Sequence, residues 1–361
     1  MSTNKSHLYF AILHTLGLTQ RNLRDILPEN AEKYYHKLDT QKLIESGFNI
    51  DRAVSIVDKK TDKTVEHVEQ TLASLHIRIV HRDDEDFPSL LRELPDCPTI
   101  LYVRGILPSN DALISIVGSR KHSQYAVSCL EKIIPDLIRA GYGVISGGAY
   151  GIDSVAHEIT LKNNGYTAAV FGSGVDLYYP PSNRGLFDQI VASGGALISQ
   201  FPLGMIAEPY NFPIRNAVVA GMSRGTLIAE AGEDSGTLIT ARLALEANRD
   251  AFVIPADITR TGALGSNRLI RDGLGKLITS AEDILSEYQI VDRQTSLLST
   301  MRPDFADPVQ ESLYEILCRD SVDIDTLSGA LQLDSQTIMM SLAMMEIDGI
   351  VTSSGGVYRV S

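Results

Sequence analysis

The sequence predicts an α/β fold for the middle of this 361-residue chain, an extended Rossmann-like, doubly wound parallel sheet. From Ala112 onward, short apolar runs alternate with amphipathic helical stretches, and nearly every run ends in Gly, Ser or Pro before a helix. Continuous apolar strands that alternate with helices are typical of a parallel sheet covered on both faces. Right-handed crossovers then make the sheet doubly wound. The runs are LISIV, YGVIS, TAAVF, ALIS, GTLIAE and AFVIP.

Different patterns flank this region. Residues 1–75 contain short stretches, such as HLYFAILHTL and TVEHVEQTLASL, with apolar residues three and four apart, which predict a helical domain. These helices resemble a SAM-like module. The Rossmann-like domain is expected over 76–290, beginning with the strand-like pieces IRIV and ILYVRG, and a linker over 291–308. Residues 309–361 suggest helices near 308–318, 325–331 and 335–348, followed by a β-hairpin, a pattern that indicates a winged-helix domain.

The overall charge at first argues against a nucleic-acid partner, because the chain carries a formal net charge of −13. The distribution is more informative. Residues 309–361 contain 2 Lys and Arg against 8 Asp and Glu, whereas residues 111–290 contain 14 against 18. A local basic site in the central segment is therefore compatible with the acidic total.

The cysteines and the apolar runs indicate the compartment in which the protein works. Cys97, Cys129 and Cys318 are far apart and form no CxxC pair, which predicts isolated thiols and neither a disulfide framework nor a zinc module. No apolar run is long enough to cross a bilayer, and the N-terminus lacks the features of a signal peptide. We expect a cytoplasmic protein with no membrane insertion, no metal site and no cofactor.

Glycine-containing turns end the predicted strands. Ligands bind beyond the carboxyl ends of the strands in an open parallel sheet. Glycine lets a backbone approach a ligand closely, and the N–H groups that begin a helix favour an anion. With Arg120 and Arg215 nearby, and Arg242 as a further candidate, several such turns on one rim suit a ligand with several phosphates. The turns comprise Gly118, Ser119, Arg120, Gly147, Gly148, Gly151, Asp153, Gly172, Gly174, Ser235, Gly236 and Thr237.

Three other interpretations can be weighed from the residues. A nicotinamide dehydrogenase needs an acidic residue at the end of the second strand, which here ends in Ser146-Gly147-Gly148. A nucleotide hydrolase could use Asp153 and His157, four residues apart on one helix face; alternatively, Asp153 orients the helix start and His157 is buried. No Walker lysine is present. A structural adaptor, whose loops are only tight turns, is the remaining alternative.

Long, ordered motifs resemble the DprA/Smf family of DNA-processing proteins. They are IVGSRKHSQYA (116–126), VISGGAYGIDSVAH (144–157), AVFGSGVDLYYPPSN (169–183), NFPIRNAVVAGMSRGTLIAEAGEDSGTLITARLA (211–244) and LGSNRLIRDG (264–273). The resemblance covers about residues 80–290. It implies a non-catalytic binder of single-stranded DNA that protects incoming DNA, helps to load the RecA recombinase in natural transformation or recombination, and forms a homodimer through the Rossmann-like domain.

The resemblance also implies roles for individual residues. Gly118-Ser119-Arg120 would be the phosphate-binding turn, with Arg120 as its main cation and Ser123 nearby. Residues from Ser146 to Asp153 would form a second wall. Further DNA-facing residues are implied at the FPxRN segment and at the next helix start. These are Phe212, Arg215 and Asn216, together with Ser235, Gly236, Thr237 and Thr240.

Some positions depart from the family pattern. Gln200 replaces a glutamate that is often found there, Ala217 replaces a common second arginine, and Ala256 replaces a glycine. Related phosphoribohydrolases look like PGGxGTxxE in their phosphate turn, whereas this chain places Thr240 where that glutamate would stand. The missing acid argues for binding over hydrolysis.

The C-terminal helix expected to read DNA in a winged helix, DSQTIMMSLAMMEIDG, has no Lys or Arg. An acidic, Met-rich surface suits adaptable packing against protein. We therefore expect a protein-contact or autoinhibitory role for this domain. The N-terminal segment LGLTQRNLRDIL lacks the second glycine of a DNA-binding hairpin, so protein contact or packing is expected there too.

Overall fold

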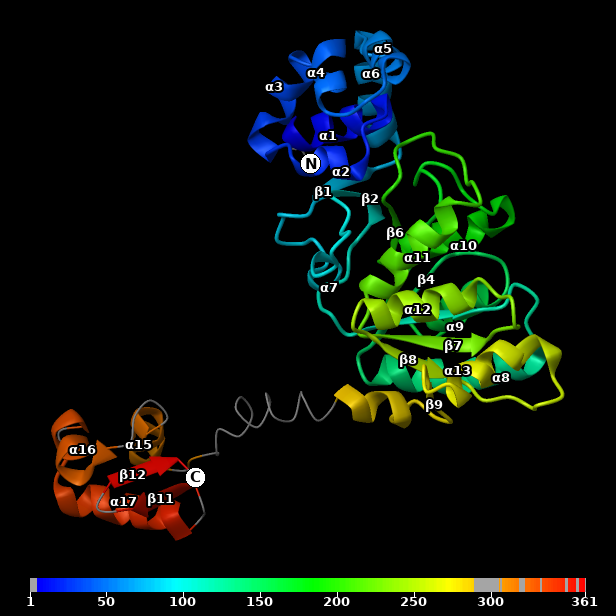
Figure 1. The fold of residues 1–361 in the computed structure, drawn as a ribbon. Helices are drawn as coiled ribbons and strands as arrows, with labels where there is room; N and C mark the ends of the chain where they lie inside the picture. The colour runs from blue at the N-terminus through cyan, green and yellow to red at the C-terminus, as the bar shows by residue number, and fades with distance from the viewer. Residues whose placement is uncertain are drawn as a thin grey trace. The chain divides into compact units, whose positions relative to one another are not determined.

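The fold is taken from a computed structural model, which describes residues 5–288, 305, 307–317, 322–331, 333–347, 350–354 and 357–360 (Figure 1). The chain divides into two compact units, residues 1–287 and 288–361, and each is described by itself. Most of the linker predicted over 291–308 lies outside the described residues.

A nine-stranded sheet, in the order β1-β2-β6-β5-β4-β3-β7-β8-β9, forms the centre of the first unit. The six apolar runs found in the sequence become β3 to β8. The strands are β1 (Ile77–His81), β2 (Ile100–Gly105), β3 (Leu113–Gly118), β4 (Gly143–Ser146), β5 (Thr167–Phe171), β6 (Ala196–Ser199), β7 (Gly225–Glu230), β8 (Asp250–Val253) and β9 (Lys276–Leu277).

The prediction of a parallel sheet holds from β6 to β9 and is wrong at one edge. β1 pairs antiparallel with β2, which in turn pairs antiparallel with β6, with Tyr102 opposite Ser199. These two strands precede the first β-α-β unit, so no crossover helix forces them into the parallel direction. The sheet is therefore mixed, with a parallel core and an antiparallel edge.

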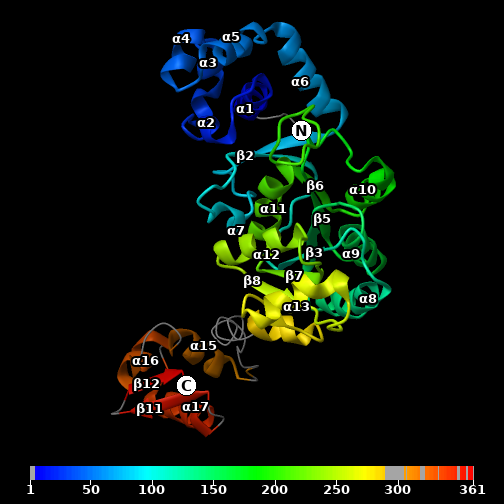
Figure 2. The same ribbon diagram turned by 45° about the vertical axis from the view of Figure 1, so that its right-hand side comes forward.

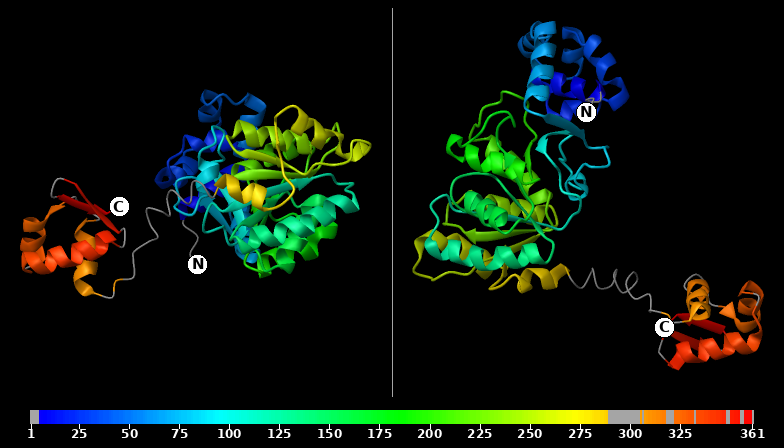
Figure 3. Two further views of the ribbon diagram at one scale, coloured as in Figure 1. Left: turned by 90° about the horizontal axis from the view of Figure 1, so that it is seen from below. Right: turned by 180° about the vertical axis from the view of Figure 1, so that it is seen from behind.

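Helices cover both faces of the sheet, as Figure 3 shows from below. On one face, α8 packs against α9 and α9 against α10; on the other, α11 packs against α12. The helices change from one face of the sheet to the other between β6 and β7. There the chain passes from β6, on one side of β3, to β7, which pairs with the other side of β3. The helices are α8 (Gln124–Arg139), α9 (Ile152–Lys162), α10 (Arg184–Ala192), α11 (Asn211–Gly221), α12 (Thr237–Glu246) and α13 (Leu264–Arg271).

Each face of the sheet has its own core. In β5, Ala169 and Phe171 belong to one apolar cluster, while Ala168 and Val170 belong to the other. This is the two-residue alternation of a strand, and all five residues of β5 are buried because both faces are covered.

Six short helices precede β1, and the first and the last of them contact this strand (Figure 2). Phe10 and Leu13 of the first helix share an apolar cluster with Tyr102 and Phe171 of the sheet. His14 Nδ1 lies 3.1 Å from the Tyr102 hydroxyl, and both side chains are buried. The helices are α1 (Lys5–Leu16), α2 (Gln20–Arg24), α3 (Ala31–His36), α4 (Thr40–Glu45), α5 (Ile50–Asp58) and α6 (Asp62–Ser74). The SAM-like assignment stays a prediction.

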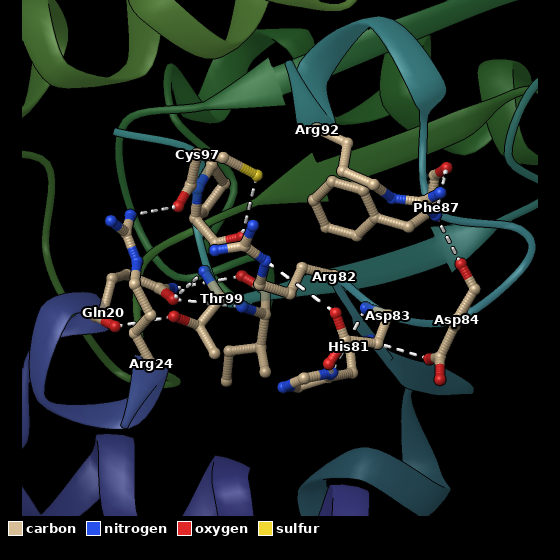
Figure 4. Close-up of polar contacts among 12 residues, drawn as sticks. Gln20, Arg24, His81, Arg82, Asp83, Asp84, Phe87, Arg92, Cys97 and Thr99 are labelled. Atoms are coloured by element: carbon tan, nitrogen blue, oxygen red, sulfur yellow. Dashed lines mark hydrogen bonds and ion pairs between the residues drawn. The ribbon is translucent and has the colours of Figure 1, made fainter. Parts of the chain in front are cut away.

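One side chain ties these helices to two strands of the sheet. The Gln20 amide donates to the carbonyls of Ile100 at 3.1 Å and Gln200 at 2.7 Å. Its oxygen accepts the backbone N–H groups of Thr99 at 2.9 Å and Ile100 at 3.0 Å (Figure 4). The amide therefore uses both of its donors and both acceptor positions.

The described residues of the second unit include three helices, α15 (Pro308–Leu317), α16 (Ile324–Leu331) and α17 (Ser335–Ile347). A three-stranded antiparallel sheet accompanies them, formed by β10 (Val322–Asp323), β12 (Val357–Val360) and β11 (Val351–Ser354). The expected helices are present, and the winged-helix assignment itself stays a prediction. Among the described residues of both units, no helix combines the length and apolarity needed to cross a membrane.

Removing the Gln20 amide should weaken the attachment of the N-terminal helices. Gln20→Ala leaves two carbonyls and two N–H groups without their partners at a partly buried position. An unsatisfied buried polar group costs about 1–3 kcal/mol, so we expect a loss of about 2 kcal/mol or more in the free energy of unfolding. Urea denaturation measures this, and Gln41→Ala, at an exposed glutamine, should change stability by less than about 0.5 kcal/mol. Equal stabilities for the two variants would contradict the assigned role.

Candidate functional site

A cavity of about 490 Å³ opens at the rim formed by the carboxyl ends of β3, β4 and β7. Most of the residues predicted from the glycine turns and the FPxRN segment line it. The lining comprises Val117, Gly118, Ser119, Arg120, Lys121, Ala149, Asp153, Phe212, Arg215, Asn216, Ser235, Gly236, Thr237 and Thr240.

The turn after β3 is shaped by glycines that let two segments touch. A Cβ on Gly118 would lie 2.6 Å from the Ile152 side chain, at the start of α9. A Cβ on Gly151 would lie 2.5 Å from the Ser119 carbonyl, and Gly151 also has a φ of +85°. Glycine is required at both positions, because a side chain would separate the turn from the helix that follows β4.

Two cations of this turn are exposed. Arg120 and its neighbour Lys121 both reach solvent at the cavity. The Arg120 guanidinium lies over the Phe212 ring, 5.4 Å from its centroid. The sequence prediction stopped at Arg120 and missed Lys121, although the lysine directly follows the turn. An anion in the cavity would thus meet two adjacent positive charges.

Arg215 lines the cavity from a buried position, and its contact with DNA stays a prediction. Its side chain is buried, and the guanidinium Nη1 donates to the carbonyls of Gly147 and of Val170, the latter at 2.6 Å. Burial lowers the pKa of Arg215 to about 10, and the nearby Asp153 opposes that shift. The positive charge of Arg215 lies in the cavity wall. Its hydrogen bonds to the two carbonyls connect the ends of β4 and β5.

Asp153 faces the same cavity from the start of α9. Its carboxylate accepts the backbone N–H of Ala149 at 3.2 Å, so it orients the turn as expected for a residue at a helix start. Burial raises the pKa of Asp153, while the Arg215 charge acts in the opposite direction. The pair supplies a buried negative and a buried positive charge behind the exposed Arg120.

The start of α12 closes the other side of the cavity. Ser235 Oγ accepts the Thr237 N–H at 3.2 Å and donates to the Thr237 hydroxyl at 3.0 Å. Gly236 is the residue before the helix, and a Cβ there would meet nothing within 4 Å. Hydroxyl groups and a helix start therefore face the exposed cations across the cavity.

The other predicted site residues support the rim without lining the cavity. The Ser146 hydroxyl donates to the Ile116 carbonyl at 2.6 Å, and Ser123 begins α8 and accepts the Arg260 guanidinium at 2.6 Å. Gly147 gives room to Arg215, since a Cβ would lie 2.6 Å from the guanidinium carbon. Four further glycines border neighbouring side chains or backbone and do not line the cavity: Gly148, Gly151, Gly172 and Gly174.

His157 does not complete a hydrolase pair with Asp153. It is fully buried, and its Nδ1 lies 2.7 Å from the Thr167 hydroxyl. That hydroxyl donates to the Val144 carbonyl at 2.9 Å, so Nδ1 carries the proton that the hydroxyl oxygen accepts. Burial lowers the pKa of His157 to about 3, which keeps the imidazole neutral. Of the two residues, only Asp153 lines the cavity.

The described cysteines form no disulfide. Cys97 and Cys129 are free thiols, and burial raises the pKa of Cys97 to about 11. Cys318 lies outside the described residues. Within the described ranges, no group of three or more His, Cys, Asp or Glu side chains is placed to hold a metal ion.

Residues 78–289 match the family described as DNA recombination-mediator protein A, over more than half of the chain. The chain belongs to this family. The matched range begins in β1 and contains every residue that lines the cavity. The motifs that resembled DprA/Smf in the sequence all lie within it.

A sequence relative and two solved structures agree with this assignment. The Protein Smf of Synechocystis is 42% identical over 214 residues, which are 58% of this chain and 52%, about half, of that relative. The X-ray structure of DNA processing protein A from Streptococcus pneumoniae matches with a TM-score of 0.65 and 30% identity, covering 79% of this chain and 98% of that one.

The DNA processing protein A of Helicobacter pylori matches with a TM-score of 0.52 and 24% identity, covering 60% of this chain and 96% of that one. Its structure is described as giving insight into single-stranded DNA binding by that protein. At this identity the match supports the fold alone.

The buried state of His157 makes stability depend on pH. The unfolded chain binds a proton near the ordinary histidine pKa of 6.5, whereas the folded pKa is about 3, so stability falls as pH drops below 6.5. In His157→Gln this loss is absent. We expect the stability of the wild type relative to the variant to fall by about 1.6 kcal/mol in total between pH 6.5 and 5, measured by urea denaturation. The slope approaches its limit of about 1.4 kcal/mol per pH unit only below this range.

The matched control is His67→Gln, at an exposed position on α6 that leaves His157 in place. This variant should keep the pH dependence of the wild type. A constant stability difference between His157→Gln and the wild type would show that the imidazole is protonated in the folded protein.

Proposed function

We propose that this chain binds single-stranded DNA in the cavity at the carboxyl ends of β3, β4 and β7, without catalysing a reaction. The observation that carries the proposal is the pairing of exposed cations with an aromatic ring. Arg120 and Lys121 stand beside Phe212 at one opening, facing the hydroxyl groups at the start of α12. Single-stranded DNA offers both a phosphate chain and unstacked bases, which such a combination suits.

The charges of the site favour binding over hydrolysis. The one acid among the residues lining the cavity, Asp153, accepts a backbone N–H and lies near the buried Arg215. A general base would have to exchange a proton with a ligand, and the neighbouring histidine does not line the cavity. Thr240 stands where related phosphoribohydrolases place a glutamate. Incubation with nucleoside monophosphates should therefore release neither base nor phosphate.

The wider role follows from the family. We propose that the chain protects incoming single-stranded DNA and helps to load RecA during natural transformation or recombination, in the cytoplasm and as a homodimer through the Rossmann-like domain. The family description, a recombination mediator, supports the role in recombination, and the remaining parts of this proposal come from the resemblance to the DprA/Smf family. Copurification with RecA, and sedimentation of the isolated protein, test the two contacts separately.

Arg120→Ala should weaken binding to single-stranded oligonucleotides with little base preference. Removing a charge-assisted hydrogen bond costs about 1.5–3 kcal/mol, which is about ten-fold or more in affinity. The slope of log affinity against log salt should also fall by about 0.7 for each phosphate that the variant no longer neutralises. Fluorescence anisotropy at several salt concentrations measures both quantities.

The charge control is Arg139→Ala, which removes one positive charge from the far end of α8, where the side chain is 76% exposed and paired with Asp136. It should leave both affinity and salt slope near those of the wild type. Unchanged binding by Arg120→Ala would remove this residue from the site.

Deletion of residues 309–361 should not abolish the binding of single-stranded DNA. The cavity lies wholly within the first unit, and the deleted segment carries an excess of six negative charges, 8 against 2. We expect equal or tighter binding by the shortened chain in the same assay. A complete loss would identify the C-terminal domain as the part that reads the DNA.

A further inference from the structure

A second cavity, of about 420 Å³, lies where the N-terminal helices meet the carboxyl end of β6. Its lining includes apolar side chains from both sides, and three arginines from the N-terminal helical region. The apolar members are Leu18, Phe201, Pro202, Met205 and Ile214. The cationic members are Arg21, Arg24 and Arg52, and one acid, Asp96, shares the lining. A mostly apolar hollow with a positive edge suits a flat apolar group attached to an anion.

The first turns of α11 separate this cavity from the proposed DNA-binding cavity. Asn211 and Ile214 line the second cavity, whereas Phe212 and Arg215 line the first. Neighbouring residues in the first turns of α11 thus line two different cavities on the same rim of the sheet. A ligand that leaves the first cavity past Phe212 reaches the second by crossing this helix start.

An exposed aromatic side chain stands at this crossing. Tyr210, directly before α11, is 63% exposed and lines the second cavity. Two residues further on, Phe212 lies beside the ring of Tyr179 at 6.0 Å between centroids, and Tyr179 is 45% exposed. Successive aromatic rings along a groove are the surfaces on which unpaired bases stack.

One of the three arginines remains available to a ligand. Arg24 donates to the Cys97 carbonyl at 2.8 Å, and Arg52 donates to the Gly17 carbonyl at 3.1 Å (Figure 4 shows the first of these). Arg21 is exposed, and within residues 5–288 its side chain has no hydrogen bond or ion pair. It is therefore the cation that can meet a phosphate group.

The wall of the cavity also holds an unused hydrogen-bond acceptor. Asn211 is 1% exposed, and its Nδ2 donates to the Ile206 carbonyl at 3.3 Å. Its Oδ1 has no partner among the described residues. A buried amide oxygen without a partner costs free energy, which an N–H group of a ligand would recover. The N–H groups on the edge of a nucleobase have the right chemistry.

We propose that the second cavity is a further subsite for the same single strand of DNA. A base stacks on Tyr210 and enters the cavity, while Arg21 contacts a phosphate. This inference rests on the proposed function, because the strand reaches the subsite from the first cavity. It assigns a ligand contact to the N-terminal helices, which otherwise only pack on the sheet.

Strand length separates the two subsites in an experiment. We would measure the affinity of the full chain for oligothymidylates of about 6 and about 20 nucleotides, lengths that bracket common single-strand site sizes. Tyr210→Ala and Arg21→Ala should each bind the longer strand about five-fold or more weakly and the shorter strand like the wild type. Tyr210→Phe should retain wild-type binding, because it keeps the ring. Arg120→Ala should weaken both lengths.

A covalent readout tests the location directly. A long strand with 5-iododeoxyuridine near one end should cross-link to Tyr210, as identified by mass spectrometry. Wild-type affinity of Tyr210→Ala and Arg21→Ala for the long strand, with no such cross-link, would overturn the subsite and leave the first cavity intact. If the wild-type protein binds neither length, the proposed function fails, and the subsite with it.

Discussion

The buried guanidinium of Arg215 is the interaction on which the rim of the sheet depends. Taking this charge out of water is costly, and hydrogen bonds to the carbonyls of Gly147 and Val170 offset that cost while joining two neighbouring strand ends. Several features of the rim follow from this contact. Glycine at position 147 leaves room for the contact, because a Cβ there would lie 2.6 Å from the guanidinium carbon and displace it from these carbonyls. Phe212 lies next to it, and Asp153 supplies the opposing charge. Arg120 is left outside as an exposed cation, so one arginine shapes the cavity wall and another faces solvent at the cavity.

The sequence predicted the parallel core and most of the cavity lining, because both follow from local patterns. Apolar runs such as TAAVF are buried on both faces, and glycines such as Gly118 mark the close turns at the strand ends. The direction of β1 and β2 could not be predicted in this way, since IRIV and ILYVRG contain nothing that specifies a partner strand. The same limit applies to Arg215. Its position in a DNA-binding motif suggests a ligand contact, and only tertiary packing determines that the side chain turns inward.

Among the residues that line the cavity, Asp153 is the one acid. Its side chain is buried near Arg215, whereas Arg120 and Lys121 are exposed. A chain with a net charge of −13 can therefore present Arg120 and Lys121 together at one opening. Net charge is a poor guide to the partner of a single site, because screening in physiological salt limits the reach of an exposed charge to about 8 Å.

The glutamine that holds the N-terminal helices has a consequence for how this protein can change in evolution. Every bond of the Gln20 amide is made to main-chain atoms of Thr99, Ile100 and Gln200. Main-chain groups are the same whatever residue occupies a position, apart from the N–H that proline lacks. Substitutions at Ile100 and Gln200 can therefore leave these bonds in place, provided that no proline enters at 100, whereas a substitution at Thr99 would also remove the bond from its hydroxyl to the Gln20 carbonyl. Position 20 has no such freedom, because a shorter, branched or charged side chain cannot present two donors and an acceptor at the same reach.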